Sequence, residues 1–421
     1  MMNCFQRTSD LKKSYLRLGE ILLAAVVLSS LSLLFFGLNA SPGAFEILQV
    51  PVALAQVIFV SFVVLGMRCK LLPVSLRYKE LLWPAVLFGY VLFVLLRSEL
   101  TLSLLLGSFW ILHILFFVAV IAFLRPYGSV SEDRIWVAVG LAAAGHLFAF
   151  MLAWVIWPDR IRANILPAFD NIRHLGYLMA PAAAVMAARF LTAKDYLKLS
   201  LVCFGAATFY LTYTGSRGGV VALIAGLSVL AVYLVWHRQQ VRFSRFIVLI
   251  FTTGLLIVAT ELLPALPWVN IFGRGAMAVG QTGREMLSGR SEIWGSTVDA
   301  IRSSWLLGNT PVYLAHIPEY QGTPLRQPHN IILQLLLHWG VLGTIIVLAN
   351  VLVFARSIWV AIALHPAKAR LPLTVLVTML THSLVDGGLF YPYSTVIAII
   401  AFASLEQIGW QELHFRSAGP G

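Results

Sequence analysis

The chain passes from polar to apolar sequence at residues 327–355, which read QPHNIILQLLLHWGVLGTIIVLANVLVFA. From Ile331 onward the stretch stays apolar for more than the roughly 20 residues that a helix needs to cross a bilayer. The preceding residues, 264–330, form the only long segment of the chain that is not strongly hydrophobic. The stretch therefore predicts a membrane-spanning helix whose first turn faces a large polar loop.

The composition of the whole chain indicates a membrane protein. Hydrophobic residues make up 59% and charged residues only 11% of the 421 residues, and the mean hydropathy is +0.85. Charged residues alone approach about a quarter of a typical soluble domain, so the composition excludes a soluble globular protein. The three cysteines, Cys4, Cys69 and Cys203, do not suggest a disulfide pair.

Apolar runs of about 16 to 24 residues predict twelve transmembrane helices. They are residues 21–38, 47–67, 81–96, 101–124, 135–157, 174–190, 199–214, 219–236, 246–263, 331–355, 371–385 and 394–410. The first run follows a basic segment, as in a signal peptide, but it is too long for one, so we interpret it as a retained helix. The predicted fold is all-α: one polytopic membrane domain over residues 1–421, with the loop 264–330 between the ninth and tenth helices.

The distribution of cations orients these helices. With the amino terminus inside, the inward loops hold 20 of the 30 Lys and Arg residues, including all the Lys. Because cation-rich loops stay on the cytoplasmic side, we expect the loop 264–330 outside. The outward cations are all Arg, whose fork of donors suits phosphate, although Arg also outnumbers Lys in the whole chain.

The outer loop contains a second patterned stretch, GRSEIW at residues 289–294. The apolar residues Trp294, Val298, Ile301 and Trp305 recur at a spacing that places them on one face of a helix. We expect an amphipathic helix lying on or near the bilayer surface.

Three outward arginines are candidates for holding an anion. Arg217 lies in a glycine-rich turn, TGSRGG at residues 214–219, where backbone can approach a ligand and the next helix begins. Arg290 opens the loop helix, and Arg173 precedes the sixth span. Together they would form a diphosphate clamp. Individually, each is also consistent with a solvated arginine. Arg217 could alternatively extend to the membrane interface or neutralise a carboxylate such as Asp386.

Histidines supply the candidate base, since imidazole accepts a proton near neutral pH. His329 precedes the tenth span and is expected to face the outer vestibule, with Asn330 beside it as a secondary candidate. His338 lies deeper in the same span and is the alternative base, although either histidine is also consistent with a structural role. His382 and Asp386 are polar groups at membrane depth without an assigned role.

The outward carboxylates are scattered, so no metal site is predicted. Together, TGSRGG (214–219), GRSEIW (289–294) and HNIILQLLLHWGVLG (329–343) resemble the O-antigen ligase and polymerase superfamily of bacterial envelope glycosyltransferases. The resemblance covers roughly residues 170 to 345. It implies a GT-C-like, multi-pass enzyme of the inner membrane whose active site faces the periplasm.

The resemblance also implies a reaction and its residues. A glycan moves from undecaprenyl diphosphate to a hydroxyl of the lipid A-core oligosaccharide, without a metal or other cofactor. Arg217, Arg290 and Arg173 bind the donor diphosphate, and His329 activates the acceptor. The expected partners are this donor, the acceptor and membrane lipid, with no nucleic acid. The alternatives are an O-antigen polymerase, a protein O-oligosaccharyltransferase, or, in another class, a polysaccharide or lipid exporter.

Overall fold

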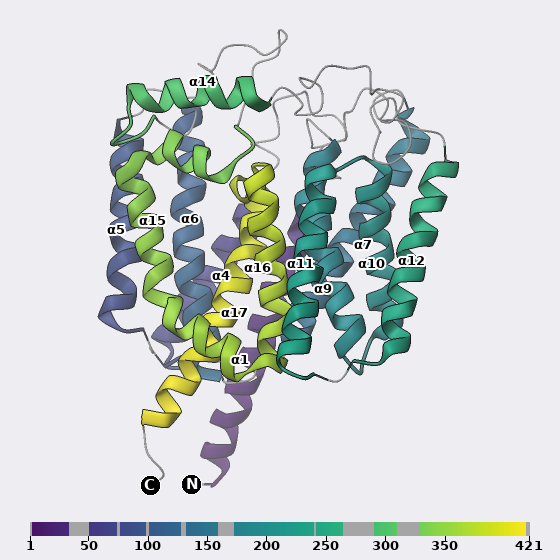
Figure 1. The fold of residues 1–421 in the computed structure, drawn as a ribbon. Helices are drawn as coiled ribbons and strands as arrows, with labels where there is room; N and C mark the ends of the chain where they lie inside the picture. Colours follow the sequence, from purple (N-terminus) through teal and green to yellow (C-terminus); the bar gives the residue numbers. More distant parts are fainter. Residues whose placement is uncertain are drawn as a thin grey trace.

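The computed structural model describes residues 2–32, 50–73, 76–97, 101–127, 132–158, 172–239, 241–263, 290–309 and 328–417. Every regular element within these ranges is a helix. The long helices run side by side between two ends of a bundle (Figure 1). Both chain termini lie at one end, and α14 (Arg290–Ser303) lies across the other. We call them the terminal end and the α14 end.

Twelve of the described helices form the bundle, and each overlaps one predicted span. They are α1 (Met2–Leu28), α4 (Val50–Arg68), α5 (Tyr78–Leu96), α6 (Thr101–Leu124), α7 (Glu132–Ile156), α9 (Gly176–Thr192), α10 (Leu197–Tyr213), α11 (Arg217–Trp236), α12 (Phe243–Leu262), α15 (Ile331–Leu364), α16 (Pro366–Val385) and α17 (Pro392–Ser417). Nine helices within the described residues are long and apolar enough to cross a membrane, and α9 and α10 are shorter apolar helices. The prediction of an all-α polytopic membrane protein is confirmed.

Several helix boundaries differ from the prediction, most clearly those of α1 and α15. The first apolar segment runs over Asp10–Leu31 rather than 21–38, and the predicted end at residue 38 lies outside the described residues. Helix α15 continues past residue 355 to Leu364. Lys and Arg are good helix formers whose long stems reach toward water, so a helix extends beyond its apolar run. Of the predicted loop, residues 264–289 and 310–327 lie outside the described ranges.

Helix α9 forms the centre of the bundle. Every residue from Gly176 to Leu191 is buried, and six of them are alanines. It packs against α7, α10, α11 and α16. Apart from Arg189, which pairs with Asp133, the buried residues of α9 are apolar or small. Such a helix is stable only when it is enclosed, and small side chains allow its neighbours to approach closely.

Buried ion pairs hold the helices together at the terminal end. Arg125, which is fully buried, donates through Nε to Glu406 Oε2 at 3.1 Å and through Nη1 to Glu80 Oε2 at 2.6 Å. Its guanidinium also lies over the Trp410 ring at 5.0 Å. Such a charge is tolerated at membrane depth because it is paired.

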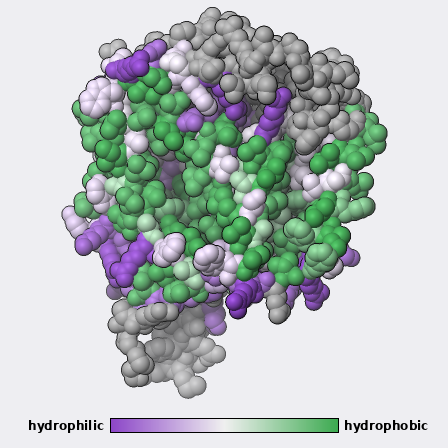
Figure 2. All heavy atoms as spheres, viewed as in Figure 1, coloured by the Kyte–Doolittle hydropathy of each residue, from purple (hydrophilic) through white to green (hydrophobic). Residues whose placement is uncertain are grey.

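The surface seen in Figure 2 has a broad hydrophobic middle, and hydrophilic residues gather near its lower edge, toward the terminal end. A belt of apolar side chains between polar ends is the pattern expected of a protein that crosses a bilayer.

Helix α15 is interrupted at Gly340, and the segment after α14 fills the break. Gly340 has φ 62° and ψ −172°. The Asn309 N–H donates to Leu337 O at 2.7 Å, and the Val341 N–H donates to Trp305 O at 2.8 Å. A Cβ on Gly340 would lie 2.4 Å from the backbone of residue 308, so only glycine fits here. The break therefore docks the end of α14 onto α15.

Candidate active site

The most informative polar pair at the α14 end joins His329 to Asp386. His329 Nδ1 lies 2.6 Å from Asp386 Oδ1, and the two side chains are 25% and 19% exposed. A carboxylate oxygen accepts a hydrogen bond from Nδ1–H, which favours the tautomer in which Nε2 carries the free lone pair. The pair thus has the arrangement of a general base and the group that orients it.

The backbone around His329 is held in an unusual conformation. His329 has φ 52°, in the left-handed region, which non-glycine residues adopt at a cost and often at functional sites. Trp294 of α14 donates from Nε1 to Pro328 O at 2.8 Å, immediately before this residue. Helix α14 therefore fixes the segment that presents the imidazole.

Asn330 ties the start of α15 to the end of α16. Its Oδ1 accepts from the N–H groups of Ile332 and Leu333, at 2.9 and 3.1 Å, as an N-cap. Its Nδ2 donates to Leu384 O at 2.9 Å. His329 lies directly before Asn330, and Asp386 lies two residues after Leu384. The hydrogen bond between Asn330 and Leu384 therefore keeps His329 and Asp386 close together.

Asp386 follows α16 and receives three hydrogen bonds on one oxygen. Besides His329, the Tyr177 hydroxyl donates to Oδ1 at 2.7 Å and the Gly387 N–H donates to it at 2.8 Å. Burial acts to raise the pKa of Asp386, but the hydrogen bond and charge of His329, the charge of His382 and the Tyr177 hydroxyl lower this pKa below its ordinary value. The carboxylate is therefore ionised near neutral pH.

His382 links Asp386 to the turn that carries Arg217. Its ring packs edge-on against Tyr177, with centroids 4.9 Å apart. A Cβ on Gly218 would lie 3.4 Å from His382 Nε2, so this turn rests directly on the imidazole. Arg217 begins α11 and is exposed.

Arg290 lies near His382, on the side of the bundle covered by α14. It is the first residue of α14, is partly buried, and interacts electrostatically with His382. Arg217 and Arg290 thus both begin helices, where free backbone N–H groups and the helix dipole also favour an anion. The structure brings these two predicted arginines to one end of the bundle with His329.

Arg173 lies in the short helix η4 (Ile172–Leu175), and its side chain is outside the described part of the structure. The next residue, His174, stacks on Tyr177 with ring centroids 5.6 Å apart, and the Tyr393 hydroxyl donates to its carbonyl at 2.8 Å. The backbone at Arg173 therefore runs beside the tyrosine that contacts Asp386.

His338 occupies a different environment. It is 4% exposed, its Nε2 lies 3.1 Å from Gln334 Nε2, and its ring packs edge-on against Phe390. It lies about two helical turns inside α15. The structure places His329 beside a carboxylate and encloses His338 among side chains of the bundle.

Sequence reasoning noted Asp386 without giving it a role and did not single out Tyr177. The available signal was an acidic residue directly after a predicted span, where a charged group requires a partner. Within the described residues, no three His, Cys, Asp or Glu side chains cluster as metal ligands.

Residues 201–348, from α10 into α15, match the model of the O-antigen ligase family. Over these residues the chain is similar to the O-antigen ligase family. This match confirms the resemblance suggested by the sequence motifs. The matched residues include Arg217, Arg290, His329, Asn330 and His338, whereas Arg173, Tyr177 and Asp386 lie outside them. A comparison with curated proteins finds no match to the chain.

Proposed function

We propose that this protein is a glycosyltransferase that moves a glycan from a polyprenyl diphosphate to an acceptor hydroxyl. The observation that carries the proposal is the 2.6 Å contact between His329 Nδ1 and Asp386 Oδ1, near the helix starts of Arg217 and Arg290. The match of residues 201–348 to the O-antigen ligase family supports it. The donor we propose is undecaprenyl diphosphate carrying O-antigen. The acceptor is a hydroxyl of the lipid A-core oligosaccharide.

In this mechanism His329 Nε2 accepts the proton of the acceptor hydroxyl as its oxygen attacks the anomeric carbon. The bond from that carbon to the diphosphate oxygen breaks, and the diphosphate leaves with the bonding electrons. Asp386 stabilises the imidazolium that forms, because its charge and its hydrogen bond both act on Nδ1. The proton is then released from His329 to solvent or to the departing diphosphate.

The arginines act on the leaving group. Guanidinium groups match the geometry of phosphate oxygens and remain charged. Arg217, Arg290 and Arg173 would bind the donor diphosphate and stabilise the charge that develops on it as the sugar departs. No metal is required for this role in the proposed mechanism, and the partners are the lipid-linked donor, the acceptor and the surrounding membrane lipid.

We also propose that the α14 end faces the periplasm from a bacterial inner membrane. The excess of cations in the inward loops of the predicted topology supports this orientation. A lipid-linked donor and a bilayer-anchored acceptor can both reach a site at the membrane surface.

The test is the lipopolysaccharide of a strain that lacks the protein, together with transfer by the purified protein. Loss of a ligase leaves core-only lipid A and polymer accumulated on the carrier, whereas loss of a polymerase leaves core plus one repeat unit. Normal lipopolysaccharide together with unglycosylated proteins would identify a protein glycosyltransferase. Transfer by the purified protein in EDTA is expected; loss in EDTA that Mg²⁺ or Mn²⁺ restores would contradict the metal-free mechanism.

A further inference from the structure

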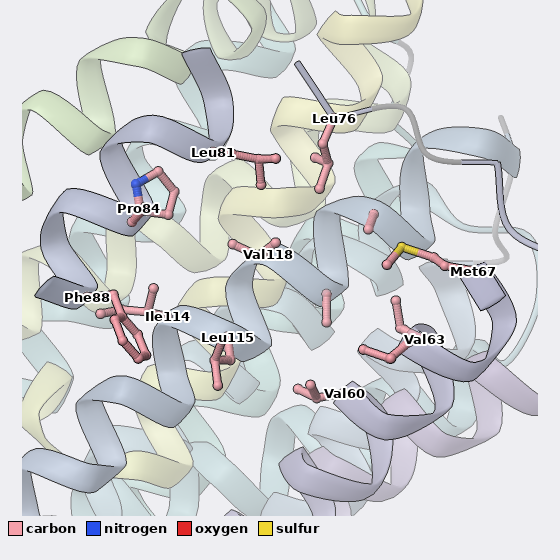
Figure 3. A pocket seen from close by; sticks show the side chains of 14 residues that line it. Val60, Val63, Met67, Leu76, Leu81, Pro84, Phe88, Ile114, Leu115 and Val118 are labelled. Atoms are coloured by element: carbon pink, nitrogen blue, oxygen red, sulfur yellow. The ribbon is translucent and has the colours of Figure 1, made fainter. Parts of the chain in front are cut away.

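An apolar groove opens on the outside of the bundle between α4, α5 and α6 (Figure 3). Its volume is about 440 Å³, and all fourteen residues that line it are apolar. Val64, Leu81 and Leu115 on its walls are 42%, 38% and 43% exposed, so the groove faces the surroundings of the protein. The volume lies within the range of about 300–1,000 Å³ that is typical of small-molecule sites.

One end of the groove lies next to a cluster of cations. Met67 and Leu76 line the groove. Arg68 and Arg77 directly follow these two residues in the chain, Lys70 lies between them, and Lys79 is three residues after Leu76. All four cations are exposed. We call Arg68, Lys70, Arg77 and Lys79 the basic rim.

The carboxylate nearest to the basic rim in sequence is already engaged. Glu80 Oε2 accepts from Arg125 Nη1 at 2.6 Å and from the Arg77 N–H at 2.7 Å. The buried Arg125 therefore draws this carboxylate into the ion-pair network at the terminal end. The basic rim keeps a net positive charge at the end of an otherwise apolar channel.

The basic rim belongs to the terminal end of the bundle. The Arg77 guanidinium contacts His414 near the end of α17, and Lys79 lies one residue from Glu80, which joins Arg125 and Glu406. His329 and Asp386 lie at the opposite, α14 end. A lipid with its charged group at His329 would therefore enter the membrane from the other side.

We propose that the groove binds one anionic glycerophospholipid of the leaflet at the terminal end. An acyl chain occupies the groove between α4, α5 and α6, and the headgroup phosphate lies among Arg68, Lys70 and Lys79. Anionic headgroups are attracted to clusters of Lys and Arg at the membrane surface. The proposal does not depend on the reaction at His329.

The test is native mass spectrometry of the full-length protein in neutral detergent, titrated with palmitoyl-oleoyl phosphatidylglycerol or palmitoyl-oleoyl phosphatidylcholine. We expect one retained phosphatidylglycerol per chain and weaker retention of phosphatidylcholine. The double variant Arg68→Gln/Lys70→Gln should lose about fivefold in preference for phosphatidylglycerol per cation removed. Ala85→Phe places a ring in the groove from its exposed wall and should weaken the retention of both lipids.

The matched control is Lys194→Gln/Lys198→Gln, which removes one exposed cation between α9 and α10 and one in the first turn of α10 and should retain phosphatidylglycerol as the unmodified protein does. Equal retention of the two lipids by the unmodified protein, or an equal loss in the control, would overturn the proposal. Displacement of phosphatidylglycerol by undecaprenyl phosphate, abolished by Ala85→Phe, would assign the groove to an isoprenoid chain and overturn it as well.

Discussion

His329 and Asp386 meet although 57 residues separate them in the chain, with His329 Nδ1 2.6 Å from Asp386 Oδ1. Asn330 and Trp294 hold the His329 side of this contact, and Tyr177 and the Gly387 N–H hold the Asp386 side. Since both partners are oriented by their own hydrogen bonds, the imidazole presents Nε2 in a defined direction. The predictions below test what this arrangement does.

His329→Ala should abolish most glycan transfer and leave donor binding intact. Positioned base catalysis typically contributes about 10²–10⁴-fold to a rate. The measurement is transfer from undecaprenyl-diphosphate-linked glycan by purified protein, with donor binding followed separately. His338→Ala is the comparison, and it tests the second histidine considered from the sequence. An active His329→Ala with an inactive His338→Ala would identify His338 as the base, and two active variants would exclude this mechanism.

Asp386→Asn should lower transfer by about 10²-fold or more, because the amide keeps the shape of the side chain but cannot stabilise the imidazolium by charge. The amide oxygen can still accept from Tyr177 and Gly387, so the variant should remain folded. Asp299→Asn is the control, because this carboxylate is 73% exposed on α14 and pairs only with the exposed Arg302 in the described structure. Unchanged transfer by Asp386→Asn would contradict the proposal that Asp386 orients His329.

Acidification should reduce the rate of glycan transfer because the His329 base becomes protonated, and not because the Asp386 carboxylate does. Burial acts to raise the pKa of Asp386, but its hydrogen bonds and the neighbouring histidines lower this pKa, so the carboxylate stays ionised across the range from about pH 5 to pH 8. A protonated imidazole cannot accept the acceptor's proton. Rates measured across this range should fall toward acid in the unmodified protein, and a rate that rises toward acid would indicate an essential acid.

Arg217→Lys and Arg290→Lys should each weaken donor binding and transfer. Lysine keeps the charge but loses the planar fork that grips two phosphate oxygens. Arg302→Lys is the matched control, since this arginine is 76% exposed in the last turn of α14. Both quantities are measured on purified, monodisperse protein. Near-normal transfer by the Arg217 and Arg290 variants would contradict the clamp.

Trp294→Phe should slow transfer several-fold while leaving the helix in place. The substitution keeps an aromatic ring but removes the N–H that donates to Pro328 O, and such a bond contributes about 0.5–1.5 kcal/mol. A positioning role predicts a lower kcat with little change in KM for the donor. Trp305→Phe, at a site 58% exposed, should behave as the unmodified protein does, and equal kcat values for all three proteins would exclude this role of Trp294.

The sequence by itself determined that the chain crosses a membrane and the order and approximate positions of its helices, because burying apolar side chains in lipid requires long apolar runs that are visible without any tertiary contact. It also located Arg217 and Arg290 at helix starts and His329 just before α15, since local turn and capping signals set those boundaries.

Only the tertiary structure decided which polar groups meet. Asp386 lies 57 residues from His329 and 209 residues from Tyr177, and no local pattern encodes contacts over such separations. The apolar spacing on α14 predicted Trp294 and Val298 as its apolar face, but both are 36% exposed, and Ile293 and Thr297 are the buried residues. The sequence pattern set the period of that helix, whereas its docking at the Gly340 break of α15 set which side is enclosed.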